Sequence, residues 1–149
     1  MVINTENNGA SYLDRDGNQT DKVHITLKTV LLSDVLRTIA KNLTRPTEML
    51  FKIDIEGSEC NAFLGSPEVL VKQQSISIIA IIMEWIFNVW PERCSAENEL
   101  KLKSLFISLS YIPFTFDDQN LVKLPIDKQW GRGVNNVLWT KENYINQTL

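Results

Sequence analysis

Acidic residues gather around a tight turn in the segment KIDIEGSE, residues 52–59. Asp54 and Glu56 precede Gly57, whose missing side chain lets the backbone turn sharply from a strand into a helix. Glu84 ends the next apolar run, so we expect it at the same edge of the sheet. In open α/β sheets that edge faces the ligand crevice. A carboxylate there can accept a hydroxyl proton or orient an acceptor, although acids beside such turns also serve simply as helix caps.

The patterns around this turn predict strands that alternate with helices. Strands are expected over Val23–Leu32, Met49–Ile55, Ser77–Glu84, Ser110–Phe116 and Asn136–Thr140. Ser33 and Ser95 are expected to be the N-caps of two helices, and Asp117–Asn120 is expected to be a turn. The order indicates an α/β fold with a mostly parallel sheet. The last two strands have no helix between them and should pair antiparallel.

Composition narrows the function classes. The chain has 149 residues and a net charge of -3, with its basic residues scattered, so we expect one domain without a nucleic-acid surface. The polar start has no apolar core of a signal peptide and no run is long enough to span a membrane, so the default location is cytoplasmic. The expected organisation is a polar lead-in over residues 1–22, a domain over 23–141 and a tail over 142–149.

Histidine and cysteine usage speaks against two kinds of site. His24 is the only histidine, which argues against a zinc site and against a Ser-His-Asp triad. No metal ligand is assigned from the sequence. Cys60 and Cys94 are too few for a disulfide framework, and a buried structural thiol is expected at Cys60.

The segment KIDIEGSE, followed by an apolar helix and Gly65, resembles the KiDvEGaE…l.G segment of the FkbM family of methyltransferases. TVLLSDVL at residues 29–36, IIME at 81–84 and NNVLW at 135–139 resemble further segments of that family in the same order. The resemblance implies a Rossmann-like class I methyltransferase sheet, with an antiparallel hairpin at one edge. It also implies methyl transfer from S-adenosylmethionine to a hydroxyl of a small molecule or sugar.

Roles for single residues follow from this resemblance. Asp54, Glu56 and Glu84 are the candidate catalytic residues, which would take the hydroxyl proton or orient the acceptor. Glu59, Trp85 and Arg132 are the candidate substrate-binding residues. The alternatives stay open, because an aromatic side chain at Trp85 is also typical of a core and an arginine at position 132 is also typical of a solvated surface.

The Gly-rich segment that would hold the cofactor is missing from this sequence. No GxGxxG-like motif follows an apolar strand, so the chain corresponds to the carboxyl-terminal half of the family's domain and its cofactor-binding residues are unknown. A second chain or a missing half would then complete the sheet beside Met49–Ile55, which would otherwise be an apolar edge. Two alternatives remain: a non-catalytic remnant that acts as an interaction module, and a metal-assisted hydrolase that uses Asp54, Glu56 and Glu84.

Overall fold

The computed structural model describes residues 29–71, 75–87, 91–117, 120–127, 130 and 134–145. The chain divides into two compact units, Met1–Val30 and Leu31–Leu149, and the described residues lie almost entirely in the second. Most of the strand predicted over Val23–Leu32 falls outside the described residues, and Leu32 itself begins a helix. Within the described part of the chain, no helix has both the length and the apolar character needed to cross a membrane.

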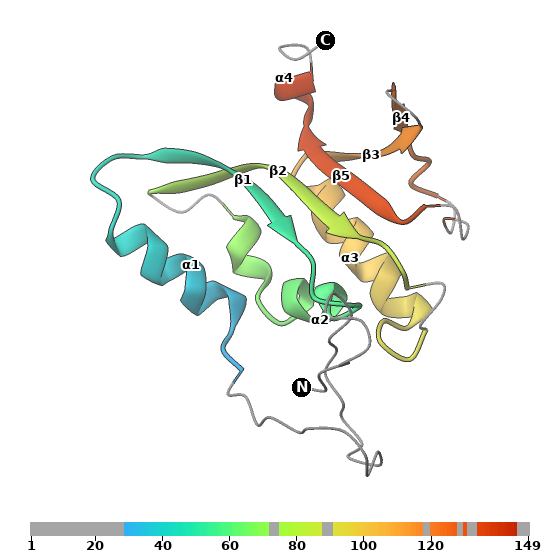
Figure 1. The fold of residues 1–149 in the computed structure, drawn as a ribbon, viewed down its shortest axis with the longest axis horizontal. Helices are drawn as coiled ribbons and strands as arrows, with labels where there is room; N and C mark the ends of the chain where they lie inside the picture. Colours follow the sequence, from blue (N-terminus) through green and yellow to red (C-terminus); the bar gives the residue numbers. More distant parts are fainter. Residues whose placement is uncertain are drawn as a thin grey trace, which may run out of the picture. The chain divides into compact units, whose positions relative to one another are not determined.

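Helices and strands alternate along most of the second unit (Figure 1). The elements are α1 (Leu32–Lys41), β1 (Thr47–Ile53), α2 (Glu59–Leu64), the 3-10 helix η1 (Pro67–Leu70), β2 (Ile76–Glu84), α3 (Ala96–Ser108), β3 (Tyr111–Asp117), β4 (Asn120–Lys123), β5 (Asn136–Lys141) and α4 (Glu142–Ile145). The predicted α/β class is confirmed. β4 was not predicted, because its short sequence follows a polar turn signal and carries little apolar pattern of its own.

The described strands form one mixed sheet in the order β1-β2-β5-β3-β4. β1 pairs parallel with β2, whereas β5 pairs antiparallel with both β2 and β3, and β4 pairs antiparallel with β3. The sheet is less parallel than the sequence predicts, because β5 returns between β2 and β3 and gives each of them an antiparallel neighbour. The predicted antiparallel pairing of the strands now seen as β3 and β5 is confirmed.

The two predicted helix caps have different outcomes. The Ser95 hydroxyl accepts a hydrogen bond from the Asn98 backbone N–H at 3.2 Å, so α3 begins with the predicted cap. α1 instead has Leu31 as its N-cap. Ser33 lies inside that helix, 2% exposed, with its hydroxyl 3.4 Å from the Ser66 hydroxyl. The predicted cap at Ser33 is wrong because this side chain packs inward toward η1.

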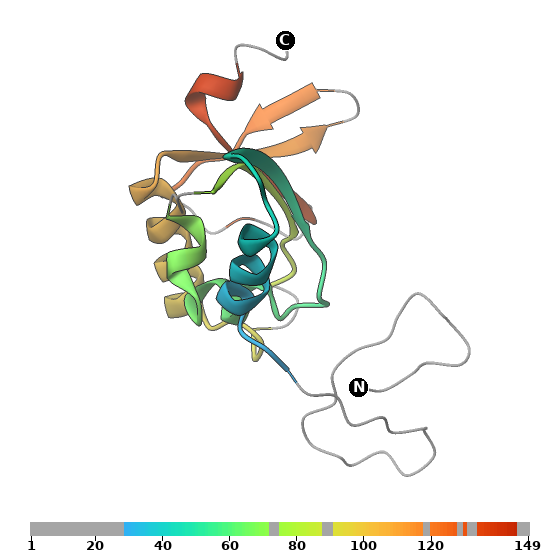
Figure 2. The same cartoon turned by 90° about the vertical axis from the view of Figure 1, so that its left-hand side faces the viewer.

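Helices α1, α2, η1 and α3 lie on one side of the sheet (Figure 2). The core fills the space between this helical layer and the strands. The Phe106 ring of α3 lies 5.2 Å from the Phe63 ring of α2 and 4.6 Å from the Trp139 ring of β5. All three side chains are completely buried. Each contributes about 1.5–3 kcal/mol through removal of apolar surface from water, so the core holds the strand ends in a fixed relation to α2.

β1 has one strand neighbour among the described strands and lies at one end of the sheet order. Its Met49 and Phe51 side chains pack against the core. Leu50 points to the opposite face and is 60% exposed. These observations agree with the expected apolar edge at this strand.

Candidate functional site

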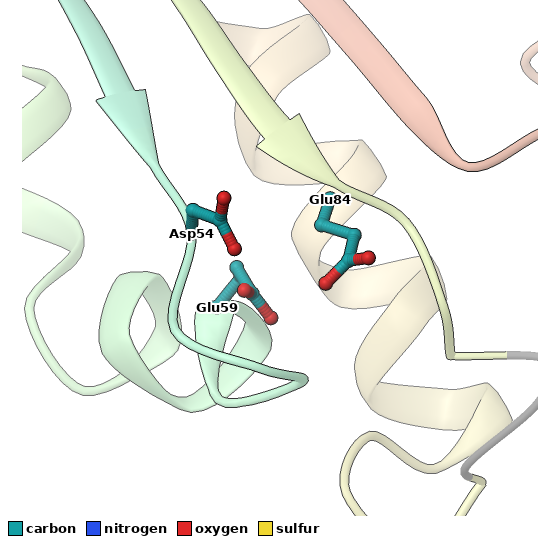
Figure 3. A group of neighbouring side chains, drawn as sticks. All are labelled: Asp54, Glu59 and Glu84. Atoms are coloured by element: carbon teal, nitrogen blue, oxygen red, sulfur yellow. The ribbon is translucent and has the colours of Figure 1, made fainter. Parts of the chain in front are cut away.

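The ends of β1 and β2 bring Asp54 and Glu84 together. The parallel register pairs Ile53 with Met83, so the next residue on each strand leaves the sheet at the same edge. Figure 3 shows the carboxyl groups of Asp54 and Glu84 turned toward that of Glu59. Each of the three side chains offers one oxygen atom within 4.8 Å of the other two. The structure thus brings together two of the predicted catalytic acids and adds one predicted substrate-binding acid.

Glu59 reaches this edge by way of a left-handed turn. Glu56 and Gly57 both have positive φ angles, of 54° and 84°, and the Ser58 N–H donates to the Ile55 carbonyl at 3.3 Å. Glycine adopts this conformation freely, whereas a glutamate there carries some strain. The turn folds α2 back, so the Ile55 N–H donates to Glu59 Oε1 at 2.8 Å. Glu59 is 0% exposed, and its Oε2 has no hydrogen-bond partner within the described structure.

The environment disfavours negative charge on two of these acids. Burial raises the pKa of the Glu59 carboxyl group, although backbone N–H groups, first that of Ile55, partly offset the effect. Burial also raises the pKa of Glu84, and the negative charges of Glu56, Asp54 and Glu59 raise it further. The site therefore holds carboxyl groups that are costly to ionise together unless positive charge is supplied.

Lys52 is the nearby cation. Its Nζ lies 3.0 Å from Asp54 Oδ2, but the two side chains are 64% and 50% exposed, so water screens the pair. Among the residues that the structure describes, no lysine or arginine forms an ion pair with Glu59 or Glu84. Buried acids ordinarily have such a partner. Glu59, the buried member of the site, therefore differs from the usual buried acid.

The segment after β2 is fastened to the turn and to α2. The Arg93 guanidinium donates to the Glu56 carbonyl, and the Asn61 side-chain amide donates to the Arg93 carbonyl at 3.2 Å. Cys60 and Cys94 form a disulfide bond and are 0% and 2% exposed. The expected free thiol at Cys60 is thus wrong, because packing of α2 beside the start of α3 brings Cys94 next to it. These contacts hold the turn that positions Glu59.

Two other predicted site residues, Glu56 and Trp85, are not part of the three-carboxylate group. Glu56 contributes its charge to the surroundings of Glu84 and its carbonyl to Arg93. Trp85 is 1% exposed, with its ring 4.4 Å from that of Trp130, which favours the core alternative. Arg132 lies outside the described residues.

Comparisons of this chain with protein-family models, with curated proteins and with solved structures found no match. Function is therefore inferred from the site itself. Converging carboxylates at a sheet edge support two kinds of chemistry. They can orient a hydroxyl group and accept its proton, or they can bind a hard cation through oxygen ligands.

Proposed function

We propose that the second unit is the carboxyl-terminal half of an FkbM-like methyltransferase domain that methylates a hydroxyl oxygen. One observation carries the proposal: the carboxyl groups of Asp54 and Glu84 meet at the carboxyl ends of two adjacent parallel strands. Ligands of open α/β sheets bind at that edge. The segment KIDIEGSE, on which the resemblance rests, forms the end of β1, the left-handed turn and the start of α2.

The sheet supports the same proposal. β1 and β2 are parallel neighbours, and β5 and β3 form an antiparallel pair further along the sheet. This arrangement agrees with the strand-and-hairpin layout that the resemblance implies. β1 lies at the end of the strand order, which is where a preceding half of the domain would continue the sheet.

S-adenosylmethionine, when bound, would supply the methyl group. The sequence contains no Gly-rich turn after an apolar strand, so the residues of this chain do not make up its pocket, and a separate cofactor half is required. This chain would instead position the acceptor. The raised pKa of Glu84 brings it closer to the value that suits a general base near neutral pH. Asp54, which is exposed, would accept a hydrogen bond from the acceptor and orient it.

A fusion tests the proposal. The cofactor half of an FkbM-family enzyme would be joined ahead of this chain, and methyl transfer to a panel of sugars and small hydroxyl compounds would be measured by mass spectrometry. We expect transfer, and we expect Glu84→Gln to slow it by about 100-fold or more, the usual effect of losing a general base. Binding of S-adenosylhomocysteine, measured by calorimetry, should be unchanged in this variant.

The control is Glu68→Gln, which alters an exposed acid of η1 and should leave transfer unchanged. A folded fusion that binds S-adenosylhomocysteine but transfers no methyl group would contradict the proposal. Equal transfer by the parent fusion and by Glu84→Gln would contradict the role of Glu84.

A second candidate function follows from the exposed edge at Leu50. An apolar edge strand with one described neighbour is typical of a surface that pairs with another chain. This interaction module would involve no cofactor. It therefore predicts that the folded fusion neither binds S-adenosylhomocysteine nor transfers methyl groups, and that replacement of Leu50 by lysine weakens self-association or partner binding.

A further inference from the structure

We propose that Asp54, Glu59 and Glu84 bind a hard divalent cation, with Ca²⁺ as the best-fitting ion. The site lies at the carboxyl ends of β1 and β2 (Figure 3). This inference goes beyond methyl transfer, because a cation can bind here with or without S-adenosylmethionine. The metal-assisted alternative in the sequence analysis used Asp54, Glu56 and Glu84, whereas the structure brings Glu59 rather than Glu56 into the group.

The spacing of the oxygen atoms fits this class of ion. One oxygen from each of the three residues lies within 4.8 Å of the others. Ca²⁺ holds oxygen ligands at about 2.3–2.6 Å, so two ligands on opposite sides of the ion are about 5 Å apart. Mg²⁺ holds them at about 2.0–2.1 Å, which gives about 4 Å. Separations of no more than 4.8 Å allow the three oxygens to share one ion, and Ca²⁺ accepts their irregular arrangement more readily than Mg²⁺, which demands near-ideal octahedral geometry.

Buried oxygen atoms without partners give a second and separate reason. Glu59 is completely buried, and its Oε2 has no hydrogen-bond partner in the described part of the chain. Its other oxygen accepts a hydrogen bond from the Ile55 N–H, which fixes the side chain, and its carboxyl group lies beside those of Asp54 and Glu84 (Figure 3). Glu84 Oε2 is likewise buried and unpartnered. Buried polar atoms without a partner are uncommon and call for an explanation, and a cation ligated by both oxygens provides one.

Lys52, the positive charge near the site, does not neutralise Glu59 or Glu84. Lys52 pairs with Asp54 Oδ2, both side chains being at least half exposed, and among the described residues it forms no ion pair with Glu59 or Glu84. A bound cation would compete with this lysine for Asp54. Replacement of Lys52 by methionine should therefore strengthen cation binding, because it removes both the competitor for Asp54 and a repelling charge.

The turn that carries the ligands is held in place before any ion binds. The Arg93 contact with the Glu56 carbonyl and the Cys60–Cys94 disulfide fasten α2 to the segment that precedes α3. Ligands that are held in position lose little conformational freedom on binding. Asp54 and Glu84 also extend from neighbouring strands of one sheet, so their spacing is set by the strand ladder.

Calorimetric titration of the full chain with CaCl₂ at pH 7, after removal of metals with a chelator, tests the proposal. We expect one Ca²⁺ per chain, with a Kd of about 10⁻⁵ to 10⁻³ M, the range of sites with moderate ligand charge. Thermal unfolding should shift upward by several degrees when Ca²⁺ is present at roughly 100 times the Kd. Mg²⁺ should bind more weakly.

Glu59→Gln is the decisive variant, because the glutamine oxygen can still accept from Ile55 while one negative charge is lost. It should weaken Ca²⁺ binding by about tenfold or more. Glu84→Gln, at a less buried position, should do the same and serves if Glu59→Gln fails to fold. Glu97→Gln, which alters an exposed acid on α3, is the matched control and should bind as the parent does.

Absence of saturable binding up to about 10 mM Ca²⁺ would overturn the proposal, because even weak protein sites bind below that concentration. Unchanged binding in both Glu59→Gln and Glu84→Gln would overturn it as well, and would place the ion elsewhere. These results are separable from the methyltransferase test. Ca²⁺ binding by this chain requires no cofactor half, and methyl transfer by the fusion can be assayed in the presence of a chelator.

Discussion

Two buried glutamates on neighbouring helices have opposite surroundings. Glu99 on α3 is 4% exposed. The ammonium of Lys103, one helical turn further on, lies 2.9 Å from Glu99 Oε1, and the two groups form an ion pair without a hydrogen bond. Glu59 on α2 is 0% exposed, and no described lysine or arginine forms an ion pair with it.

The described part of the fold supplies a counter-ion for the buried charge of Glu99 and none for that of Glu59. Lys103 is 2% exposed, and its ammonium also lies 4.1 Å from the centre of the Trp130 ring, a second favourable contact for a cation. The core acid thus has its own counter-ion. The acid at the strand ends has instead two acidic neighbours, Asp54 and Glu84. Acids with disfavoured charge at a sheet edge are typical of ligand sites rather than of structural ion pairs.

The largest expected effect comes from replacing Lys103, the buried lysine that pairs with Glu99 in the core. Lys103→Met should lower the free energy of unfolding by about 3–5 kcal/mol, because Glu99 is then left charged and buried without its partner. Urea unfolding followed by tryptophan fluorescence measures the change. The double variant Glu99→Leu/Lys103→Met should recover most of the loss, since apolar side chains of similar volume can replace a buried pair. A loss below about 1 kcal/mol for Lys103→Met would contradict this account.

The next effect concerns the disulfide that fixes α2. Replacement of both Cys60 and Cys94 by alanine should cost about 2–4 kcal/mol, because their cross-link restricts the unfolded chain over a sequence separation of 34 residues. The same replacement should weaken Ca²⁺ binding, since Glu59 is the residue before Cys60. Urea unfolding and calorimetry on the same samples measure both quantities. Equal stability of the parent with and without reductant would show that the cross-link is not formed.

A third test uses the Tyr111 hydroxyl, a polar group in the core that has a hydrogen-bond partner. The Tyr111 hydroxyl donates to the Ile78 carbonyl at 2.6 Å, and burial raises the pKa of Tyr111 from 10.0 to about 12. The raised pKa means that the protonated form stabilises the fold fully below pH 10. This stabilisation, roughly 2–3 kcal/mol, is lost as the pH rises through about 12. Unfolding measured from pH 8 to 12 should show the fall.

Tyr111→Phe should cost about 1 kcal/mol at neutral pH, the usual net value of one hydrogen bond, and should reduce the alkaline fall. Tyr144→Phe measures the remaining part of the fall, because the hydrogen bond of the Tyr144 hydroxyl to Glu48 raises the pKa of this second tyrosine as well. An alkaline fall of full size in Tyr111→Phe would assign it to another group.

The smallest expected effect tests the contrast between Glu59 and Glu99 most specifically. The change in the free energy of unfolding should have opposite signs when each of them is replaced by glutamine. Without divalent cations at pH 7, Glu59→Gln should raise the free energy of unfolding by about 1 kcal/mol, since it removes a buried charge that has no ion-pair partner among the described residues. Glu99→Gln should lower it, because Lys103 then loses its counter-ion. Urea unfolding in chelator resolves the two signs. Destabilisation by both variants would mean that Glu59 is compensated within the fold.

The sequence alone predicts those helices and strands that are specified by patterns within a short segment. The two-sided apolar run before Glu84 predicts β2, and Ser95 predicts the start of α3 with its hydrogen bond to Asn98. Asp54 near the end of the predicted strand Met49–Ile55 and Glu84 at the end of the next strand predict their shared edge, because parallel strands end on the same side. These predictions depend only on periodicity, caps and turn residues, which are properties of short segments.

Long-range features could not be predicted in the same way. The place of β5 between β2 and β3 depends on pairing across many residues, and no local signal specifies a partner strand. The disulfide depends on two cysteines brought together by packing of α2 beside α3. The burial of Glu59 depends on the left-handed conformation of Glu56, which is rare for glutamate and which the adjacent glycine signals only for its own position.

The most direct test of the central claim is the location of a bound ion in crystals of the full chain grown with Mn²⁺, which can replace Ca²⁺ at oxygen sites and gives an anomalous signal. We expect an anomalous peak within bonding distance of oxygens from Asp54, Glu59 and Glu84, and loss of that peak in Glu59→Gln. A well-ordered strand edge without a peak, or with Lys52 turned inward onto Glu59, would contradict it.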